Sequence, residues 1–147
     1  MMAGMTLIVR TISRLLFPFL LLFGAYVILH GHLTPGGGFP GGVIVAAAVV
    51  LLILAYGIDS VLKRMSVTRA EVLESLGAIG IAIIGILGII AGSAFLQNVF
   101  PTGQLGQLFS AGELPILYLS VGIKVMAGIT LVCFAMLFAF WGDHHES

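Results

Sequence analysis

Apolar residues in this chain fall into four long runs, separated by short polar or glycine-rich stretches. A helix needs about 20 mostly apolar residues to cross a bilayer core about 30 Å thick, at roughly 1.5 Å per residue. Four segments reach or approach this length, and they predict membrane-spanning helices at about 11–29, 41–56, 73–95 and 115–141. We therefore expect an all-α integral membrane protein with one membrane domain over residues 1–147.

Composition supports the membrane interpretation and excludes several classes of function. Hydrophobic residues make up 60% of the chain and charged residues only 8%, whereas an ordinary soluble domain is about 25% charged. The formal net charge is zero, so the basic surface that nucleic-acid binding requires is missing. The single cysteine, Cys133, lies within an apolar run. We therefore expect neither a disulfide framework nor a metal site, and no bound cofactor or catalytic site of the chain's own.

Basic residues near the helix ends predict the orientation, because they favour the cytoplasmic side. Arg10 and Arg14 precede or open the first helix, and three more basic residues lie between the second and third: Lys63, Arg64 and Arg69. The stretches 30–40 and 96–114 contain no Lys or Arg. We expect a multi-pass protein of the cell membrane with both termini in the cytoplasm.

Local signals refine the helix ends. Thr68 and Glu71 have the spacing of a capping box that opens the third helix. Pro115 suits the first turn of the fourth helix, where its missing N–H costs nothing. Trp141 lies where an interfacial aromatic anchor is expected.

The segment 30–42, which holds two prolines and six glycines, predicts irregular backbone between the first two helices. The apolar run after it is only about 16 residues, or roughly 24 Å, so part of this loop is expected at membrane depth. Irregular backbone is tolerated there only where protein covers it or where it lines a watery cavity, as in transporter ion sites. The alternative is an external turn whose glycines allow close packing, and the residues alone leave both open.

Lys124 is predicted about nine residues into the last helix, roughly 14 Å deep and near the middle of the bilayer. A charge there costs at least about 2.5–3.5 kcal/mol, so the side chain should face protein or water. Helical spacing places Ser120, Ala127 and Gly128 on the same face. We favour a role in an ion or proton path over a structural ion pair with a carboxylate of another subunit.

Four other polar residues carry weaker predictions. Glu71 is expected to stabilise the start of the third helix through its dipole. Glu74, one turn deeper, is a candidate for binding a cation or contacting a partner. Asp59, at the end of the second helix, can pair with Lys63. His32 is either a proton acceptor at the mouth of a path or a hydrogen-bond donor that holds the glycine turn.

The third predicted helix carries a stripe of small residues on one face. Such glycines allow two helices to approach closely, so the stripe predicts a packing contact with another helix. That helix belongs either to this chain or to a neighbour. The stripe consists of Gly77, Gly80, Gly85, Gly88 and Gly92.

The segment from Gly31 to Gly42 resembles the GHxxPGGGFxGG signature of the B subunit of multisubunit Na⁺/H⁺ antiporters. Residues 100–112 resemble the external loop before the last helix of that family, and the similarity extends over most of the chain. The signature is long and unusual, so coincidence is a poor explanation. The residues that match it are His32, Pro35, Gly36, Gly37, Gly38, Phe39, Gly41 and Gly42.

The resemblance implies a four-helix subunit of an antiporter module with no activity alone. The same module occurs in archaeal membrane-bound hydrogenases and sulfane-sulfur reductases. Residues 121–125, with Lys124 where antiporter B subunits usually have an apolar or aromatic residue, are closer to those archaeal homologues. This favours a respiratory complex as host.

We therefore predict a subunit that contributes to a path for Na⁺ and H⁺ at its contacts with other membrane subunits. Its expected partners are those subunits and membrane lipid. The candidate path residues are Lys124, His32, Glu74 and Ser120. One alternative is a subunit of a stand-alone antiporter complex, and another is a purely structural spacer. A small homo-oligomeric transporter would be expected to carry a membrane carboxylate, and the predicted helix bounds place none near the midplane.

Overall fold

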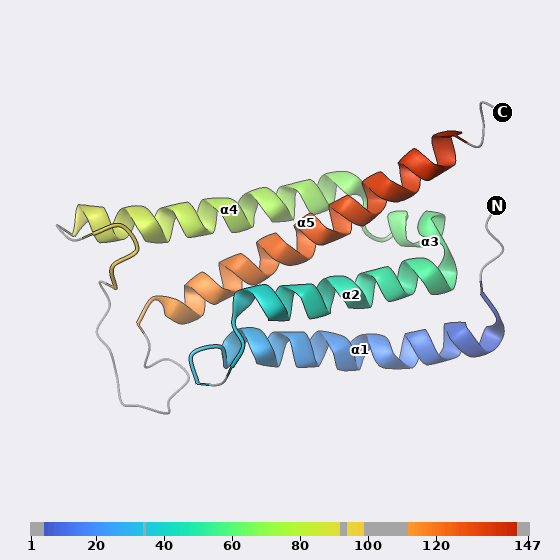
Figure 1. The fold of residues 1–147 in the computed structure, drawn as a ribbon, viewed down its shortest axis with the longest axis horizontal. Helices are drawn as coiled ribbons and strands as arrows, with labels where there is room; N and C mark the ends of the chain where they lie inside the picture. Colours follow the sequence, from blue (N-terminus) through green and yellow to red (C-terminus); the bar gives the residue numbers. More distant parts are fainter. Residues whose placement is uncertain (1–4, 34, 92–93, 99–111, 144–147) are drawn as a thin grey trace.

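The computed structural model describes residues 5–33, 35–91, 94–98 and 112–143, with only the backbone for residues 140–143. These parts contain five helices and no strand: α1 (Leu7–Leu29), α2 (Gly38–Tyr56), α3 (Ile58–Leu62), α4 (Val67–Ile90) and α5 (Leu114–Asp143) (Figure 1). Four of them, α1, α2, α4 and α5, are long and apolar enough to cross a membrane. The predicted all-α architecture is confirmed.

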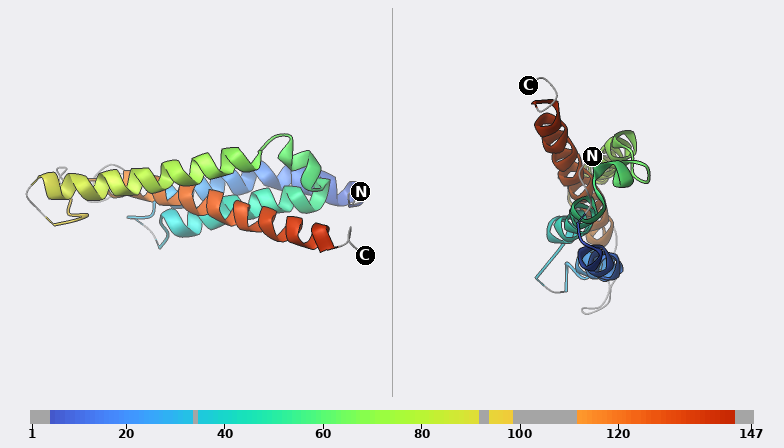
Figure 2. Two further views of the ribbon diagram at one scale, coloured as in Figure 1. Left: turned by 90° about the horizontal axis from the view of Figure 1, so that it is seen from above. Right: turned by 90° about the vertical axis from the view of Figure 1, so that its right-hand side faces the viewer.

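The long helices form a row rather than a closed bundle. α1 packs on α2, α2 on α5 and α5 on α4, whereas α1 touches α5 only slightly. In the end-on view of Figure 2, α1 (blue) and α4 (green) lie on opposite sides of α2, and α5 crosses the row obliquely. Both edge helices expose many large apolar side chains, including Phe19 and Leu22 on α1 and Ile79 and Ile83 on α4. Such faces suit lipid or other membrane proteins.

The two ends of the row differ. One end, here called the terminal end, holds the start of α1, the end of α5 and the short helix α3 (Figure 1). The opposite end, here called the loop end, holds the connections from α1 to α2 and from α4 to α5. All five basic residues that were used to predict the orientation lie at or near the terminal end.

Helix α2 begins at Gly38, three residues before the predicted start at 41, so the expectation of irregular backbone throughout 30–42 is wrong for residues 38–42. Gly37 makes this start possible because its φ of 121° lies where only glycine is comfortable. Pro40 is the third helical residue, and first-turn residues need no intrahelical N–H bond. The 19 residues of α2 extend about 28 Å, so α2 nearly spans the core without the loop.

A sharp turn at Gly57, with φ 84°, separates α2 from α3, an element that the sequence pattern did not predict. Val61 of α3 packs with Val49, Ile53 and Phe134, which closes the terminal end with apolar contacts. Asp59 was expected at the end of the second helix. It lies instead in the first turn of α3, exposed.

Helix α4 begins at Val67, six residues before the predicted start at 73. Its N-cap is Ser66, whose Oγ accepts a hydrogen bond from the backbone N–H of Arg69 at 3.4 Å. The predicted capping box is therefore wrong, and Thr68 and Glu71 lie exposed within the helix. α4 ends at Ile90, five residues earlier than predicted.

Helix α5 begins at Leu114, so Pro115 lies in its first turn as expected. The backbone at Trp141 is helical, and its predicted role as an anchor lies outside the described side chains.

Candidate functional site

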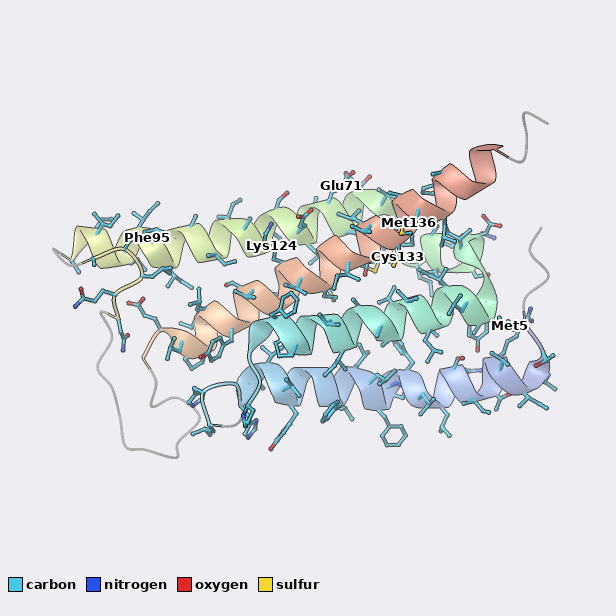
Figure 3. The ribbon with its side chains drawn as sticks, viewed as in Figure 1. Met5, Glu71, Phe95, Lys124, Cys133 and Met136 are labelled. Atoms are coloured by element: carbon cyan, nitrogen blue, oxygen red, sulfur yellow. The ribbon has the colours of Figure 1, made fainter. Side chains whose placement is uncertain are left out.

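A charged contact between two of the long helices joins Glu74 of α4 to Lys124 of α5. Lys124 Nζ donates a hydrogen bond to Glu74 Oε1 at 3.3 Å. The Lys124 side chain is 41% exposed and the Glu74 side chain is 39% exposed. Figure 3 shows Lys124 between α4 and α5. It lies ten residues after Leu114, or about 15 Å along the helix, which places it near the middle of the span Leu114–Ala139. Two opposite charges therefore meet well inside the membrane-spanning region.

The true start of α4 changes the position of Glu74. Glu74 lies seven residues after Val67, about two turns or 10 Å into the helix, rather than near its opening. A carboxylate therefore does reach the neighbourhood of the midplane. The partner of Lys124 also comes from this chain, whereas the structural alternative in the sequence analysis placed it on another subunit.

Glycines set the distance between α4 and α5 at this pair. A Cβ on Gly77 would lie 2.8 Å from both the backbone N and the Cβ of Lys124, and 2.9 Å from the carbonyl oxygen of Ser120. A Cβ on Gly80 would lie 2.7 Å from Ser120 Oγ, and that hydroxyl donates to the Ile116 carbonyl at 3.0 Å. The two backbones therefore touch, and Ser120 and Lys124 both lie against α4.

The rest of the glycine stripe has a different neighbour. Gly85 packs against the ring of Phe95, and Gly88 packs against the backbone of residues 94 and 97. These two glycines accommodate the segment 94–98 that folds back after α4, not a second helix. Gly92 lies outside the described residues.

The glycines at the start of α2 make close contacts on both sides. A Cβ on Gly38 would lie 3.1 Å from the backbone N of Gly122 on α5, and one on Gly42 would lie 2.7 Å from its carbonyl oxygen. On the opposite side, a Cβ on Gly41 would lie 2.8 Å from the carbonyl oxygen of Gly24 on α1. The first turns of α2 are thus wedged between α1 and α5. This geometry favours the close-packing interpretation of the motif.

The other motif residues lie at the surface or in the turn. Gly37 is buried, and its φ of 121° reverses the chain into α2. Gly36 lies beside Val27 of α1, while Pro35 and Phe39 are exposed.

His32 lies on the other side of α5 from the charged pair. Its neighbour Gly31 packs against Gly37 and the ring of Tyr118. Tyr118 and Ser120 are two residues apart, about 200° around the helix, so they face opposite ways. The structure therefore brings Lys124, Glu74 and Ser120 together and leaves His32 apart.

Glu113 is a buried acid that the sequence pattern did not single out. This residue is only 4% exposed and directly precedes α5. Its backbone N–H donates to Asn98 Oδ1 at 3.1 Å. Ser120 and Lys124 follow at seven and eleven residues, which is the spacing of one helix face. That spacing was readable in the sequence, but the acid stands just before the predicted start of the helix at 115.

Metal ligands do not gather in the described parts of the chain. No group of three or more His, Cys, Asp or Glu side chains that could hold a metal ion occurs there. Cys133 is half-buried within α5. Residues 100–111, which carry most of the second motif, lie outside the described residues.

Four helices able to cross a membrane, with an ion pair inside the span of two of them, define a multi-pass membrane protein. Comparison with known proteins places it more closely. The chain belongs to the MnhB family, whose model, described as a domain related to the MnhB subunit of Na⁺/H⁺ antiporter, matches residues 8–131.

Individual relatives cover most of this chain. The chain is 34% identical over 131 residues to a putative antiporter subunit, mnhB2, of Staphylococcus aureus, covering 84% of this chain and 92% of that protein. It is 37% identical over 136 residues to an uncharacterised protein of Methanocaldococcus jannaschii, covering 85% of this chain and 51% of the relative. The chain thus spans only about half the length of that relative.

One solved structure shares both fold and sequence. A chain of the membrane-bound sulfane sulfur reductase, an archaeal respiratory membrane complex, matches with a TM-score of 0.78 and 39% identity. The match covers 92% of this chain and 60% of that chain.

Proposed function

We propose that this chain is a small membrane subunit of a multisubunit Na⁺/H⁺ antiporter module. In this role it contributes Lys124, Glu74 and Ser120 to a path for Na⁺ or H⁺. Its partners would be other membrane subunits, and the ligands of the path would be the transported ions.

The ion pair carries this proposal. Two charged side chains about 40% exposed in this single chain cannot face hydrocarbon without a large cost. They must therefore be covered by another membrane subunit or contact water. Either environment suits a path formed between subunits, where a paired acid and base can exchange ions.

His32 receives less support as a member of this path, because it lies on the opposite side of α5. We retain it as a candidate at the loop end, where the signature motif turns into α2. The helical start of the motif and its backbone contacts support a packing role for Gly38, Gly41 and Gly42.

One observation supports a respiratory complex as the host: the matched solved structure is of an archaeal respiratory membrane complex. The resemblance of residues 121–125 to the archaeal homologues, given in the sequence analysis, implies the same host. In such a host any redox chemistry would belong to partner chains, because this chain has one cysteine and no cysteine cluster for iron–sulfur binding. The alternative host is a stand-alone antiporter complex, as the Staphylococcus relative's name suggests. Neighbouring genes for metal-binding subunits would favour the respiratory host.

The proposed orientation places the terminal end in the cytoplasm. Arg10, Arg14, Lys63, Arg64 and Arg69 all belong to that end, and basic flanks favour the cytoplasmic side.

Paired substitutions in the assembled complex test the function. Lys124→Gln or Glu74→Gln alone leaves one uncompensated charge at membrane depth, so each is expected to reduce both assembly and transport. The double variant, with both substitutions, restores neutrality and should restore assembly. A path requires the charges themselves, so Na⁺-dependent proton transport in vesicles should stay about a hundredfold or more below wild type, the lower end of the usual loss when a proton-transfer group is removed.

Glu71→Gln is the matched control, because it removes an exposed carboxylate of the same helix. A double variant that assembles and transports normally would support the structural spacer instead. Purification and sizing of the native protein address the remaining rival, since a small homo-oligomer without other subunits would exclude the module.

A further inference from the structure

Two arginines lie near the start of α1, four residues apart and therefore on one face of the helix. Arg10 is half-buried against the end of α2, where Tyr56 Oη donates a hydrogen bond to the Arg10 carbonyl oxygen at 3.1 Å. The guanidinium carbon of Arg10 lies 6.0 Å from the centroid of the Tyr56 ring. Arg14 is exposed. One arginine is thus held at the contact between α1 and α2, and the other lies beside it on the open surface.

These two positive charges have no counter-ion among the residues that the structure describes. Arg10 Nε is buried, yet none of those residues supplies a hydrogen-bond acceptor to it. No described carboxylate pairs with Arg10 or Arg14, and Asp59, the acid of α3 at the same end, is exposed. An arginine keeps its proton in a protein, so a partly buried guanidinium group needs an acceptor to offset its lost hydration. We therefore expect the acceptor to come from outside this chain.

The depth of the two arginines matches the headgroup region of a bilayer. Arg10 lies 19 residues before Leu29, about 28 Å along α1, which is close to the bilayer core thickness of about 30 Å. Arg10 therefore stands near one boundary of the core. Arg14 lies about 6 Å deeper, but helical side chains tilt toward the N-terminus, and a long arginine side chain extends back to the boundary. Both guanidinium groups therefore reach the same interface.

The surface beside the arginines favours a lipid over an acid of a partner subunit. Deeper along α1, large apolar side chains are exposed, among them Leu15, Phe19 and Leu22. A cationic boundary followed by an apolar strip matches a molecule with an anionic head and an acyl chain. A single phospholipid satisfies both parts, whereas a partner's carboxylate would satisfy only the charges. Tyr56 adds an aromatic ring at the level where tyrosine is enriched in membrane proteins.

We propose that Arg10 and Arg14 bind the phosphate of an anionic phospholipid at the terminal end of α1 and α2. A guanidinium group forms two parallel N–H···O hydrogen bonds with a phosphate, and the position of Arg10 over the Tyr56 ring holds its side chain ready for them. Basic sites between membrane helices recognise anionic headgroups in this way. The acyl chain would lie along Leu15 and Phe19. The site is separate from the Glu74–Lys124 pair, so it does not depend on the proposed ion path.

Lipid binding by the assembled complex tests the proposal. The complex is placed in phosphatidylcholine nanodiscs with increasing phosphatidylglycerol, and the phosphatidylglycerol that stays bound after release is counted by native mass spectrometry. The double variant Arg10→Gln/Arg14→Gln should lower the affinity for one bound phosphatidylglycerol about twentyfold or more, since each basic residue near a membrane surface contributes about fivefold. Lys63→Gln is the matched control, because it removes an exposed basic side chain at the same end. It should bind phosphatidylglycerol as the wild type does.

Arg14→Gln alone keeps the test decisive if the double variant does not fold, because Arg14 is exposed and should still lower the affinity about fivefold. Wild-type binding in the arginine variants, or an equal loss in Lys63→Gln, would overturn the site. Two further results would also overturn it. One is displacement of the bound lipid by millimolar inorganic phosphate, which would indicate a site for free phosphate. The other is loss of a subunit from the double variant in pure phosphatidylcholine, which would assign the arginines to a partner's carboxylate.

Discussion

Gly77 lies directly against the backbone of Lys124, so the absence of a side chain at this position of α4 determines where the ammonium group of α5 lies. A Cβ on Gly77 would lie 2.8 Å from the Lys124 backbone nitrogen. The backbones of α4 and α5 are therefore in direct contact at Gly77 and Lys124. The same contact brings Glu74, three residues earlier on α4, within reach of Lys124.

Gly77→Ala is therefore expected to push α4 and α5 apart and weaken the Glu74–Lys124 pair. Overpacking a close contact costs about 1–3 kcal/mol, so the thermal stability of the purified complex should fall clearly. Gly80→Ala is the matched control, because its Cβ would meet the Ser120 hydroxyl, which can rotate away. Equal stability of the two variants would show that the backbone contact does not hold the pair.

Gly38→Ala tests whether the signature motif serves packing. Its Cβ would meet the Tyr118 carbonyl oxygen and lie 2.8 Å from the Cβ of Val121, so α2 and α5 must separate. We expect a loss of about 1–3 kcal/mol in stability. Gly36→Ala should cost less, because its Cβ would lie 3.2 Å from a Val27 methyl group and 3.3 Å from the Val27 carbonyl oxygen, both farther than the contacts at Gly38. Thermal denaturation of the purified complex measures both. A motif that served only ion binding would lose transport in Gly38→Ala with no loss of stability.

Ser66→Ala tests the observed start of α4. Loss of an N-cap hydroxyl typically costs about 1 kcal/mol. We expect Ser66→Ala to cost less than this typical value, because the hydrogen bond from the Arg69 N–H to Ser66 Oγ is long, at 3.4 Å. Thr68→Ala is the matched control, because Thr68 lies exposed inside the helix and has no capping role there. If Thr68→Ala were instead the more destabilising change by chemical or thermal unfolding, the predicted capping box would be right after all.

Hydrophobic run length was enough to predict the four spans, because the bilayer core demands a minimum apolar length. The ends were harder to predict. Ser66 gives the same local signal as Thr68, and the choice between them depends on how Arg69 and the preceding turn pack. The start of α2 at Gly38 depends on Tyr118 and Gly122, which are about 80 residues away in the sequence, so local propensity pointed to a loop.

At the candidate site, too, some features could be predicted from the sequence and others could not. Lys124 stood out because a charge in an apolar run is costly anywhere. Its pairing with Glu74 could not be predicted, since the correct depth of Glu74 required the start of α4 at Val67. Helical spacing also links Glu113 with Ser120 and Lys124, yet its burial depends on contacts with the segment that follows α4.

The orientation is a further prediction that single cysteines can test. Lys63 is exposed at the terminal end and Leu33 at the loop end, on connections that lie on opposite sides of the membrane if α2 crosses it. In a Cys133→Ser background, a membrane-impermeant thiol reagent added to intact cells should label Leu33→Cys, while Lys63→Cys should react only after the membrane is opened. The reason is electrostatic as well as topological, because Lys63 lies near Arg64 and Arg69 in the basic connection that insertion retains in the cytoplasm. To leave that basic cluster intact, the same label can be placed at Ser60, which is exposed on α3 and uncharged. Labelling of Ser60→Cys from outside intact cells would reverse the assigned sides and move the loop end, with Glu113, to the cytoplasm.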